Sequence, residues 1–501
     1  MLKKANELFC SFRNCDIVYC HWKSNEHLAA GLDGETDLDV LMAPKDKKKA
    51  TAQLWVCGYE KVRPQFGARY PEVEDWVSMD EETGKLLHVH LHYRMITGHK
   101  GMKEYGLPWA ELALNTRVLD EARNIFITEP NLEIILLLAR IGLKMKLASY
   151  MRCKLNRYVI SEDDQREIRY LQKRIDANQV KNIAMDYFYN PNEIGRLATA
   201  DRLDAQWVRA VHGAMWKDLQ KYRDMPLLPF FFRSIFFRVG MSVTSRFKKY
   251  LPLMDITKKT LEQRGLIVAI IGQDGAGKST VSADCVKWLR WKLEAERCYL
   301  GSGGHYHSVE KTIRKKIGKS RHIISRLLYG YLTVRDNLKL SKRTVKTLFR
   351  ADTYRRKGAI AIFDRYPQID YAGINDGPKI RAYVERFSVP ILFRRYFNHL
   401  ADREEANLKK ALEIQPDVVI KLTLTPEESI RRKPEESLDT VRKKREIIQK
   451  LSFPCSKVFT VDAAQPYERE LLEIRRIIWG AIREAGQKSW VEERFAKSDE
   501  K

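Results

Sequence analysis

One segment of the chain has residue types and spacing that point to a specific chemistry. Residues 272–280 read Gly-Gln-Asp-Gly-Ala-Gly-Lys-Ser-Thr and match the phosphate-binding P-loop pattern G-x-x-x-x-G-K-[ST]. Glycines let backbone N–H groups approach phosphate oxygens, because they carry no Cβ atom. The Lys278 ammonium would bind the outer phosphates, and the Ser279 hydroxyl would ligate Mg²⁺. The segment predicts binding of a nucleoside triphosphate. The predicted binding residues are Gly272, Gln273, Asp274, Gly275, Ala276, Gly277, Lys278, Ser279 and Thr280.

A second group of polar residues follows the apolar segment 359–363. Asp364, at the carboxyl end of this predicted strand, would lie near the nucleotide and hold Mg²⁺ or orient an acceptor oxygen. Arg365 beside it has a planar guanidinium that matches phosphate oxygens. Basic residues farther along could close over the transferring phosphoryl group as a lid, or form a solvated helix face. They are Arg431, Arg432, Lys433, Arg442, Lys443, Lys444 and Arg445.

A third group lies near the N-terminus. Asp37 and Asp39 alternate along the predicted strand 36–41, so both carboxylates point to one face, as binding of one or two Mg²⁺ ions requires. Three alternating histidines follow on the predicted strand 87–92. They could bind a metal or, on an edge strand, be merely solvated. These histidines are His88, His90 and His92.

Apolar segments must position the residues around the P-loop. Residues 266–271 form a run of buried-strand length before the loop, and residues 281–289 have helical spacing after it. The phosphates would therefore meet a helix N-terminus. Residues 359–363 and the segment from 416 predict further strands. This alternation predicts an α/β domain with a mostly parallel sheet flanked by helices.

The order of these motifs resembles that of the thymidylate kinases, which are P-loop nucleoside monophosphate kinases. The resemblance rests on the P-loop, Asp364-Arg365-Tyr366, Pro416-Asp417 with Pro426-Glu427, and Val461-Asp462-Ala463, and covers under half of the chain. It implies an ATP- and Mg²⁺-dependent phosphotransferase that acts on dTMP or on another phosphorylated small acceptor. It also implies that Lys278, Asp364, Arg365, Arg431 and Arg432 are catalytic, that Ser279 and Asp364 hold Mg²⁺, and that Asp274, Arg365 and Tyr366 bind the acceptor.

Two segments depart from that family. Ile270-Ile271 stands where thymidylate kinases have Phe-Glu, and Leu300-Gly-Ser-Gly-Gly304 replaces their Arg-Glu-Pro-Gly-Gly, which removes one expected contact to the acceptor. The segment 305–350 is also strongly basic. These differences favour an acceptor that is more anionic or larger than a nucleoside monophosphate, such as a phosphorylated sugar on a glycan pathway.

The N-terminal D-x-D pattern resembles the nucleotidyltransferase fold, in which a Gly-Ser turn and a helix precede the two aspartates. Ser24 precedes the predicted helix 25–32, although Lys23 stands in place of the glycine. The resemblance implies a metal held by Asp37 and Asp39, with a third carboxylate from a later strand. An active transferase and an inactive, substrate-recruiting or regulatory domain are both consistent with it.

The length and the net charge of the chain limit how many domains it can form and which partners it can bind. The chain has 501 residues, 44% hydrophobic residues and a net charge of +25, so we expect several folded domains and polyanionic partners. We expect a nucleotidyltransferase-like α+β domain over 1–128, a helical region with an aromatic and basic linker over 129–263, the P-loop domain over 264–490, and a polar tail over 491–501.

The linker and the cysteines bear on partners and location. Residues 226–250 mix phenylalanines with basic residues, so this helix either lies in a membrane interface or buries its aromatic side chains between domains. Cys10, Cys15 and Cys20 lack zinc-site spacing, which indicates buried or free thiols. No apolar signal segment is visible, so we expect a cytoplasmic protein, with peripheral membrane contact and a homodimer both left open.

Two other functions fit the same sequence. The positive charge is compatible with a nucleic-acid-dependent ATPase or defence-type module, although Asp364-Arg365 and the lid-like basic residues favour a small acceptor. The other alternative is a nucleotidyltransferase in which the kinase-like domain has a regulatory role.

Overall fold

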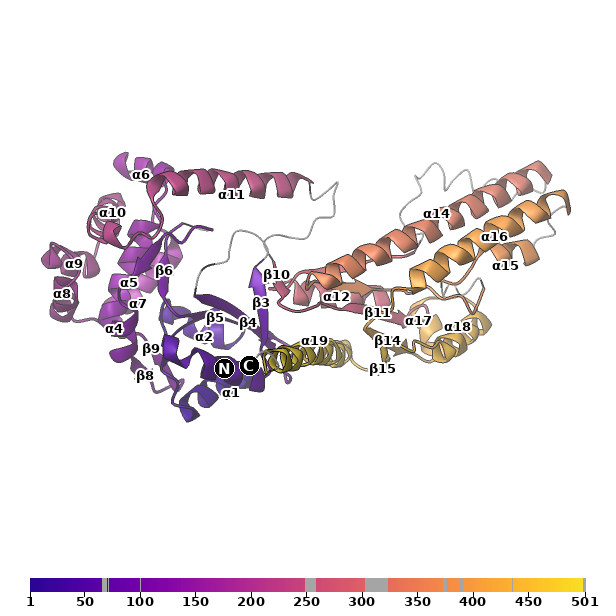
Figure 1. Cartoon of the computed structure of the whole chain (residues 1–501), viewed down its shortest axis with the longest axis horizontal. Helices are drawn as coiled ribbons and strands as arrows, with labels where there is room; N and C mark the ends of the chain where they lie inside the picture. Colours follow the sequence, from indigo (N-terminus) through magenta and orange to yellow (C-terminus); the bar gives the residue numbers. More distant parts are fainter. Residues whose placement is uncertain are drawn as a thin grey trace. The chain divides into compact units, whose positions relative to one another are not determined.

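The structure is a computed structural model that divides into two compact units, Met1–Lys259 and Thr260–Lys501 (Figure 1). It describes all residues except 65–69, 71, 100, 248–257, 302–322, 373–375, 387–390, 435 and 499–501. The basic segment 305–350 therefore lies outside the described residues up to residue 322. Each unit has its own sheet and its own hydrophobic core, so the two are described in turn.

The first unit is built on a mixed sheet with the strand order β3-β4-β5-β2-β1-β9-β8. β2 (Leu38–Met42) and β5 (Leu86–His92) run parallel, whereas β4 (Val73–Met79) pairs with β5 in the antiparallel direction. β5 therefore lies inside the sheet. The other strands of the unit are β1 (Tyr19–His21), β3 (Glu60–Pro64), β8 (Val118–Asp120) and β9 (Ile125–Ile127), with β6 (Met95–Thr97) and β7 (Tyr105–Leu107) in a separate pair, while β10 (Lys259–Leu261) spans the unit boundary.

Helices bury both faces of this sheet. α1 (Lys3–Asn14) packs its apolar side chains with Val40 of β2, and α5 (Pro130–Leu143) belongs to the cluster that contains Leu41. α5 begins where the Glu129 side chain accepts a hydrogen bond from Leu132 N, with Pro130 at the first helical position. Helices of the predicted region 129–263 thus share a core with the first strands.

The remaining helices of the first unit complete that core or extend from it. They are α2 (Leu28–Leu32), α3 (Lys47–Val56), α4 (Ala110–Asn115), α6 (Leu147–Lys154), α7 (Glu162–Gln172), α8 (Ala177–Met185), α9 (Pro191–Ala198), α10 (Ala205–Leu219) and α11 (Leu227–Phe247), with 3₁₀ turns at Asn25–His27, Pro44–Asp46 and Gln220–Tyr222. Among the described residues, no helix combines the length and the apolar character that crossing a membrane requires.

The second unit contains a five-stranded sheet in the order β12-β13-β11-β14-β15. All of its neighbouring strands pair in parallel. The three central strands are almost continuous apolar runs, which suits strands covered by helices on both faces. The prediction of an α/β domain with a parallel sheet is confirmed. The strands are β11 (Ile267–Gly272), β12 (Ala295–Cys298), β13 (Ile360–Phe363), β14 (Val418–Thr423) and β15 (Lys457–Asp462).

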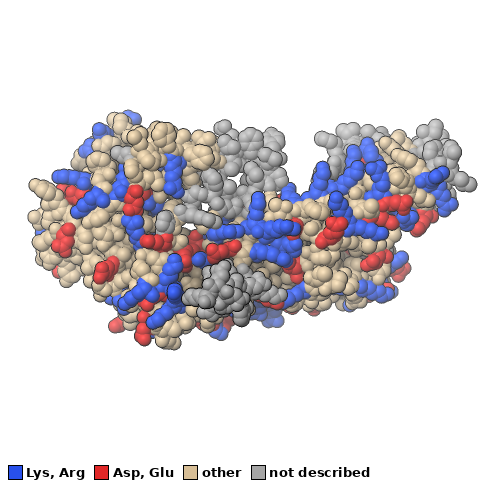
Figure 2. Space-filling view, in the orientation of Figure 1, with Lys and Arg blue, Asp and Glu red and all other residues tan. Residues whose placement is uncertain are grey.

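Helices alternate with these strands along the chain. α12 (Lys278–Leu289) follows the P-loop directly. α14 (Ile323–Arg356) and α16 (Ile391–Leu412) pack side by side along their lengths (Figure 1), and Lys and Arg side chains gather along α14 on the face shown in Figure 2. The others are α15 (Ile380–Arg386), α17 (Pro426–Arg432), α18 (Leu438–Lys450) and α19 (Tyr467–Ser498), which continues into the predicted polar tail.

A buried lysine fixes the end of α18 to the sheet. Lys421 of β14 is only 8% exposed, and its ammonium donates to the carbonyl oxygens of Gln449 at 3.0 Å and Leu451 at 2.8 Å. Carbonyl groups at a helix C-terminus have no partner inside the helix, so this lysine satisfies acceptors that would otherwise be buried.

We expect Lys421→Met to destabilise the second unit by about 1–3 kcal/mol, because two acceptors at the end of α18 lose their donor. Urea unfolding together with hydrogen–deuterium exchange of residues 438–450 measures the change. Lys443→Met, at an exposed position of the same helix, is the matched control. Equal exchange in both variants would contradict a role for Lys421 in holding α18.

Candidate active site

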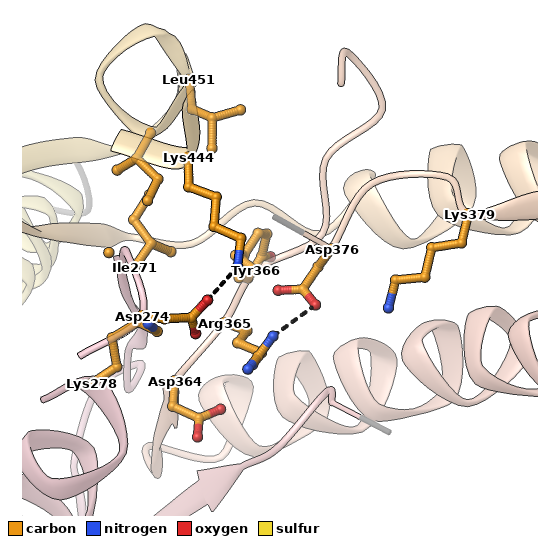
Figure 3. A pocket seen from close by; sticks show the side chains of 12 residues that line it. Ile271, Asp274, Lys278, Asp364, Arg365, Tyr366, Asp376, Lys379, Lys444 and Leu451 are labelled. Carbon is orange, nitrogen blue, oxygen red and sulfur yellow. Dashed lines mark hydrogen bonds and ion pairs between the residues drawn. The ribbon is translucent and has the colours of Figure 1, made fainter. Parts of the chain in front are cut away.

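A cavity of about 190 Å³ lies at the carboxyl ends of β11 and β13 (Figure 3). The P-loop, the residues after β13 and helix α18 all contribute side chains to it, as expected where parallel strands end together. Charged groups dominate its lining. The lining residues are Ile271, Gly272, Asp274, Lys278, Asp364, Arg365, Tyr366, Asp376, Lys379, Lys444, Ile448 and Leu451.

The P-loop has the backbone conformation that its glycines permit. Gly275 and Gly277 have φ angles of +83° and +79°, which L side chains rarely adopt. A Cβ atom on Gly275 would also lie 2.9 Å from the carbonyl oxygen of Ser429. α12 starts at Lys278 immediately after the loop, so its unpaired N–H groups and positive dipole end face the cavity.

Lys278 lies at the bottom of the loop. Its ammonium donates to the carbonyl oxygen of Gln273 at 2.7 Å. Burial lowers the pKa of Lys278 to about 8, against the opposing attraction of Asp274. The ammonium is therefore charged at neutral pH. Phosphate oxygens in place of the carbonyl would raise its pKa, because they carry negative charge.

Asp364 forms the buried acidic wall of the cavity. It is 1% exposed, and its Oδ2 accepts hydrogen bonds from Ser279 Oγ at 3.2 Å and Arg297 at 2.8 Å. No described residue hydrogen-bonds its Oδ1, although that atom is buried. A buried carboxylate oxygen without a partner, next to a P-loop hydroxyl, suits Mg²⁺, which prefers oxygen ligands. Ser279 and Asp364 therefore fit the predicted magnesium site.

Two further cations, Arg365 and Lys379, line the cavity. Arg365 Nη1 lies 3.4 Å from Asp376 Oδ1. Burial opposes the charge of Arg365, but Asp376 and other acidic groups raise its pKa. The Lys379 side chain extends toward the same space (Figure 3), and no described residue bonds its ammonium. These two groups could hold an anionic acceptor.

The predicted lid residues fall into two groups. Lys444 of α18 lines the cavity, and its ammonium lies 2.5 Å from Asp274 Oδ2. Burial would raise the pKa of Asp274, but the hydrogen bond from Lys444 and the charge of Lys278 lower it to about 2. Arg431 and Arg432 of α17 instead both pair with Glu428 and do not line the cavity.

Tyr366 contributes its ring to the cavity wall, whereas its hydroxyl donates to the carbonyl oxygen of Ile414. Three residues of the site carry no local sequence signal. Arg297 lies within the short strand β12, and Asp376 and Lys379 lie in a segment without a motif. Only the tertiary fold brings them to the P-loop. Of the lid-like residues, Lys444 lines the cavity, and the Lys433 ammonium lies 3.9 Å from Asp274 Oδ1.

The structure also brings together the N-terminal residues that the sequence singled out. Asp37 Oδ1 lies 2.7 Å from His88 Nδ1, and Asp39 Oδ1 lies 3.1 Å from His92 Nε2. The alternative that these histidines are solvated on an edge strand is wrong, because β5 lies between β4 and β2. Burial lowers the pKa of His90 to about 3, so its imidazole is neutral at physiological pH.

Asp75 is a third carboxylate that sequence reasoning missed. It belongs to β4, where it lies opposite His90 in the register between β4 and β5. Burial would raise the pKa of Asp75, but His90, His88 and Lys259 hold it well below the usual range. Nothing in the local sequence of β4 indicated its position next to the histidines.

Comparisons with known proteins place this chain near ATP-binding proteins. No family model matches it. The uncharacterized ATP-binding protein YghR of Escherichia coli (strain K12) is 26% identical over 225 residues, which cover 42% of this chain and 86% of YghR. The uncharacterized ATP-binding protein YghS of the same strain is 25% identical over 230 residues, which cover 43% of this chain and 93% of YghS.

Among solved structures, a deoxyadenosine kinase from M. mycoides, with the products dCMP and a flexible dCDP bound, covers 42% of this chain. The match covers 98% of that kinase, at 17% identity and a TM-score of 0.29. The similarity to YghR agrees with the P-loop geometry. This chain therefore has a P-loop region similar to ATP-binding proteins, while the kinase and nucleotidyltransferase assignments stay predictions.

Proposed function

We propose that the second unit is an ATP- and Mg²⁺-dependent phosphotransferase that acts on a small phosphorylated acceptor. The observation that carries the proposal is one cavity in which a P-loop lysine, a buried carboxylate and two acceptor-side cations face one another. The name of the relative YghR, an ATP-binding protein, supports ATP as the nucleotide. Phosphoryl transfer depends mainly on positioning and charge neutralisation, and these groups supply both.

The P-loop would bind ATP, the phosphoryl donor. Backbone N–H groups at the start of α12 and the Lys278 ammonium would hold the phosphates of ATP. Ser279 and Asp364 would hold Mg²⁺, which neutralises charge on the phosphate oxygens when bound. Lys444 would move from Asp274 toward the transferring group, because phosphate oxygens offer its ammonium a stronger partner.

The acceptor side sets the chemical class of the second substrate. Arg365 and Lys379 place two cations across the cavity from Lys278, which favours an acceptor that already carries phosphate. An acceptor phosphate oxygen would attack the γ-phosphorus, the bond to the β-phosphate oxygen would break, and ADP would leave. dTMP is the nearest candidate by resemblance, and a sugar phosphate is the alternative. Purified protein with γ-labelled ATP, Mg²⁺ and a panel of both acceptor classes separates these possibilities.

We expect Lys278→Ala to lower the rate of phosphoryl transfer by about 100- to 1,000-fold or more, because a preorganised cation is lost at the phosphates. Label transfer from γ-labelled ATP measures it. Lys287→Ala, at an exposed position of the same helix, should retain the parental rate. Unchanged turnover in Lys278→Ala would sink the kinase proposal.

Arg365→Ala tests the acceptor side separately from the donor side. We expect the KM for the acceptor to rise about 10- to 100-fold, because one charge-assisted contact is lost. The KM for ATP should stay nearly unchanged. Steady-state kinetics with each substrate varied in turn gives both constants. Arg356→Ala, which removes an exposed arginine paired with Asp352, is the control. A defect confined to ATP would contradict the assigned role.

We also propose that α11 places the protein at an anionic membrane surface. Leu228, Phe231, Phe232, Ile235 and Val239 follow helical spacing and are 44–71% exposed. The other side of the helix faces the first unit, where Phe237 lies against Gly101. Apolar side chains on one face, in a strongly basic chain, are the properties of an interfacial helix.

Vesicle flotation of the intact chain tests this proposal. We expect binding to vesicles that contain anionic lipid, and a loss of about tenfold or more when Phe231 and Phe232 become Ser, because two apolar side chains leave the interface. Tyr189→Ser removes an aromatic residue that is 85% exposed outside α11, and should not change binding. Absence of vesicle binding by the parental chain rejects the membrane role.

A second candidate function, nucleotidyl transfer, belongs to the first unit. Asp39 on β2 and Asp75 on β4 lie on either side of β5, and Asp37 lies just before β2 against His88, so three carboxylates come close together, as the resemblance to the nucleotidyltransferase fold implies. We propose it as an activity separate from phosphoryl transfer. Transfer of label from α-labelled nucleoside triphosphates to a product would demonstrate this activity. The transfer should be lost in Asp39→Asn.

A further inference from the structure

Six potential metal ligands share one face of the sheet in the first unit. The register places Asp39 of β2 opposite His90 of β5, and His90 opposite Asp75 of β4. Because side chains alternate along a strand, residues two positions away lie on the same face. The six side chains are Asp37, Asp39, Asp75, His88, His90 and His92.

Their donor atoms are close enough to share an ion. Ligand atoms of Asp37, His88 and His90 all lie within 4.8 Å of one another, as do those of Asp39, His90 and His92. Asp75 Oδ1 lies 3.3 Å from His88 Nε2 and 3.4 Å from His90 Nε2. Two ligands of a tetrahedral ion at about 2.1 Å are separated by about 3.4 Å.

An ammonium group already occupies the position between these atoms. Lys259 Nζ lies 2.6 Å from Asp75 Oδ1, 2.8 Å from His88 Nε2 and 3.2 Å from His90 Nε2. A cation is thus held by one carboxylate and two imidazoles, which are donors that a metal ion also uses. A second ammonium, that of Lys23, lies 2.8 Å from Asp39 Oδ1.

The donor set does not match the magnesium that a nucleotidyltransferase fold implies. Mg²⁺ binds oxygen ligands in octahedral geometry, whereas three of the six side chains here offer imidazole nitrogen. Mixed imidazole and carboxylate sites suit Zn²⁺, Mn²⁺, Fe²⁺ and Co²⁺. His88 is fully buried, so its imidazole is held in place before any ion binds.

We propose that the first unit binds a divalent first-row transition metal between His88 Nε2, His90 and Asp75, at the position that the Lys259 ammonium holds, while Asp37 holds the other ring nitrogen of His88. The ion competes with that ammonium for the same donor atoms. Lys259 therefore sets the affinity of the site, and the metal is bound more tightly when this lysine is absent. This inference does not depend on phosphoryl transfer by the second unit.

The experiment uses the full chain without nucleotide, titrated with Co²⁺, Zn²⁺ and Mg²⁺. The visible d–d bands of Co²⁺ report nitrogen and oxygen ligation, and the absence of thiolate charge-transfer bands excludes the cysteines. We expect Co²⁺ and Zn²⁺ to bind at least about tenfold more tightly than Mg²⁺. His90→Gln should weaken Co²⁺ binding by about tenfold or more, since a direct ligand is lost.

Two further variants complete the test. Lys259→Met should tighten Co²⁺ binding several-fold, and His27→Gln, which alters a histidine paired with Glu26 outside the cluster, should leave it unchanged. His90 is 27% exposed, so His90→Gln should preserve the fold, and circular dichroism checks this. A preference for Mg²⁺, retained binding in His90→Gln, or no gain in Lys259→Met would each overturn the proposed site.

Discussion

Parallel pairing of β11 with β13 and β14 is the constraint on which the P-loop site depends. Because the three strands run in one direction, the P-loop, Asp364 and the turn after β14 all emerge at the same edge of the sheet. Side chains then tie these exits together. Gln273 donates to the carbonyl oxygen of Leu424, and Ser429 Oγ donates to that of Asp274, across 151 and 155 residues of sequence.

The same edge collects charge that protein groups balance. Lys278 donates to a backbone carbonyl, Lys444 pairs with Asp274, and Arg365 pairs with Asp376. Burying an unpaired cation would cost several kcal/mol, so these partners keep the site stable before substrates arrive. In the proposed phosphotransferase, phosphate oxygens would replace these partners.

Much of this architecture could be predicted from local sequence. The P-loop and its flanking strand are contiguous, and the apolar runs of β11 and β13 required no knowledge of the fold. Asp75 could not be predicted, because its importance depends on β4 lying next to β5. The burial of His88 and His92 has the same origin, since a pattern of alternation looks identical on an edge strand and inside a sheet. The position of Lys379 in the cavity could not be predicted either, because it depends on how the chain after β13 folds back to the P-loop.

For the basic residues after β14, the spacing along the helix indicates which of them can reach the cavity, whereas their charge alone does not. Arg431 and Arg432 follow Glu428 at i+3 and i+4, so a partner on the same helical face neutralises them. Lys444 instead follows buried Val441 by three positions and precedes buried Ile448 by four. Those spacings put Lys444 beside the inward stripe of α18, toward the sheet and Asp274. A lysine next to a buried stripe needs hydrogen-bond acceptors inside the protein, which Asp274 and Glu436 supply to Lys444, and that requirement separates it from the solvated basic residues.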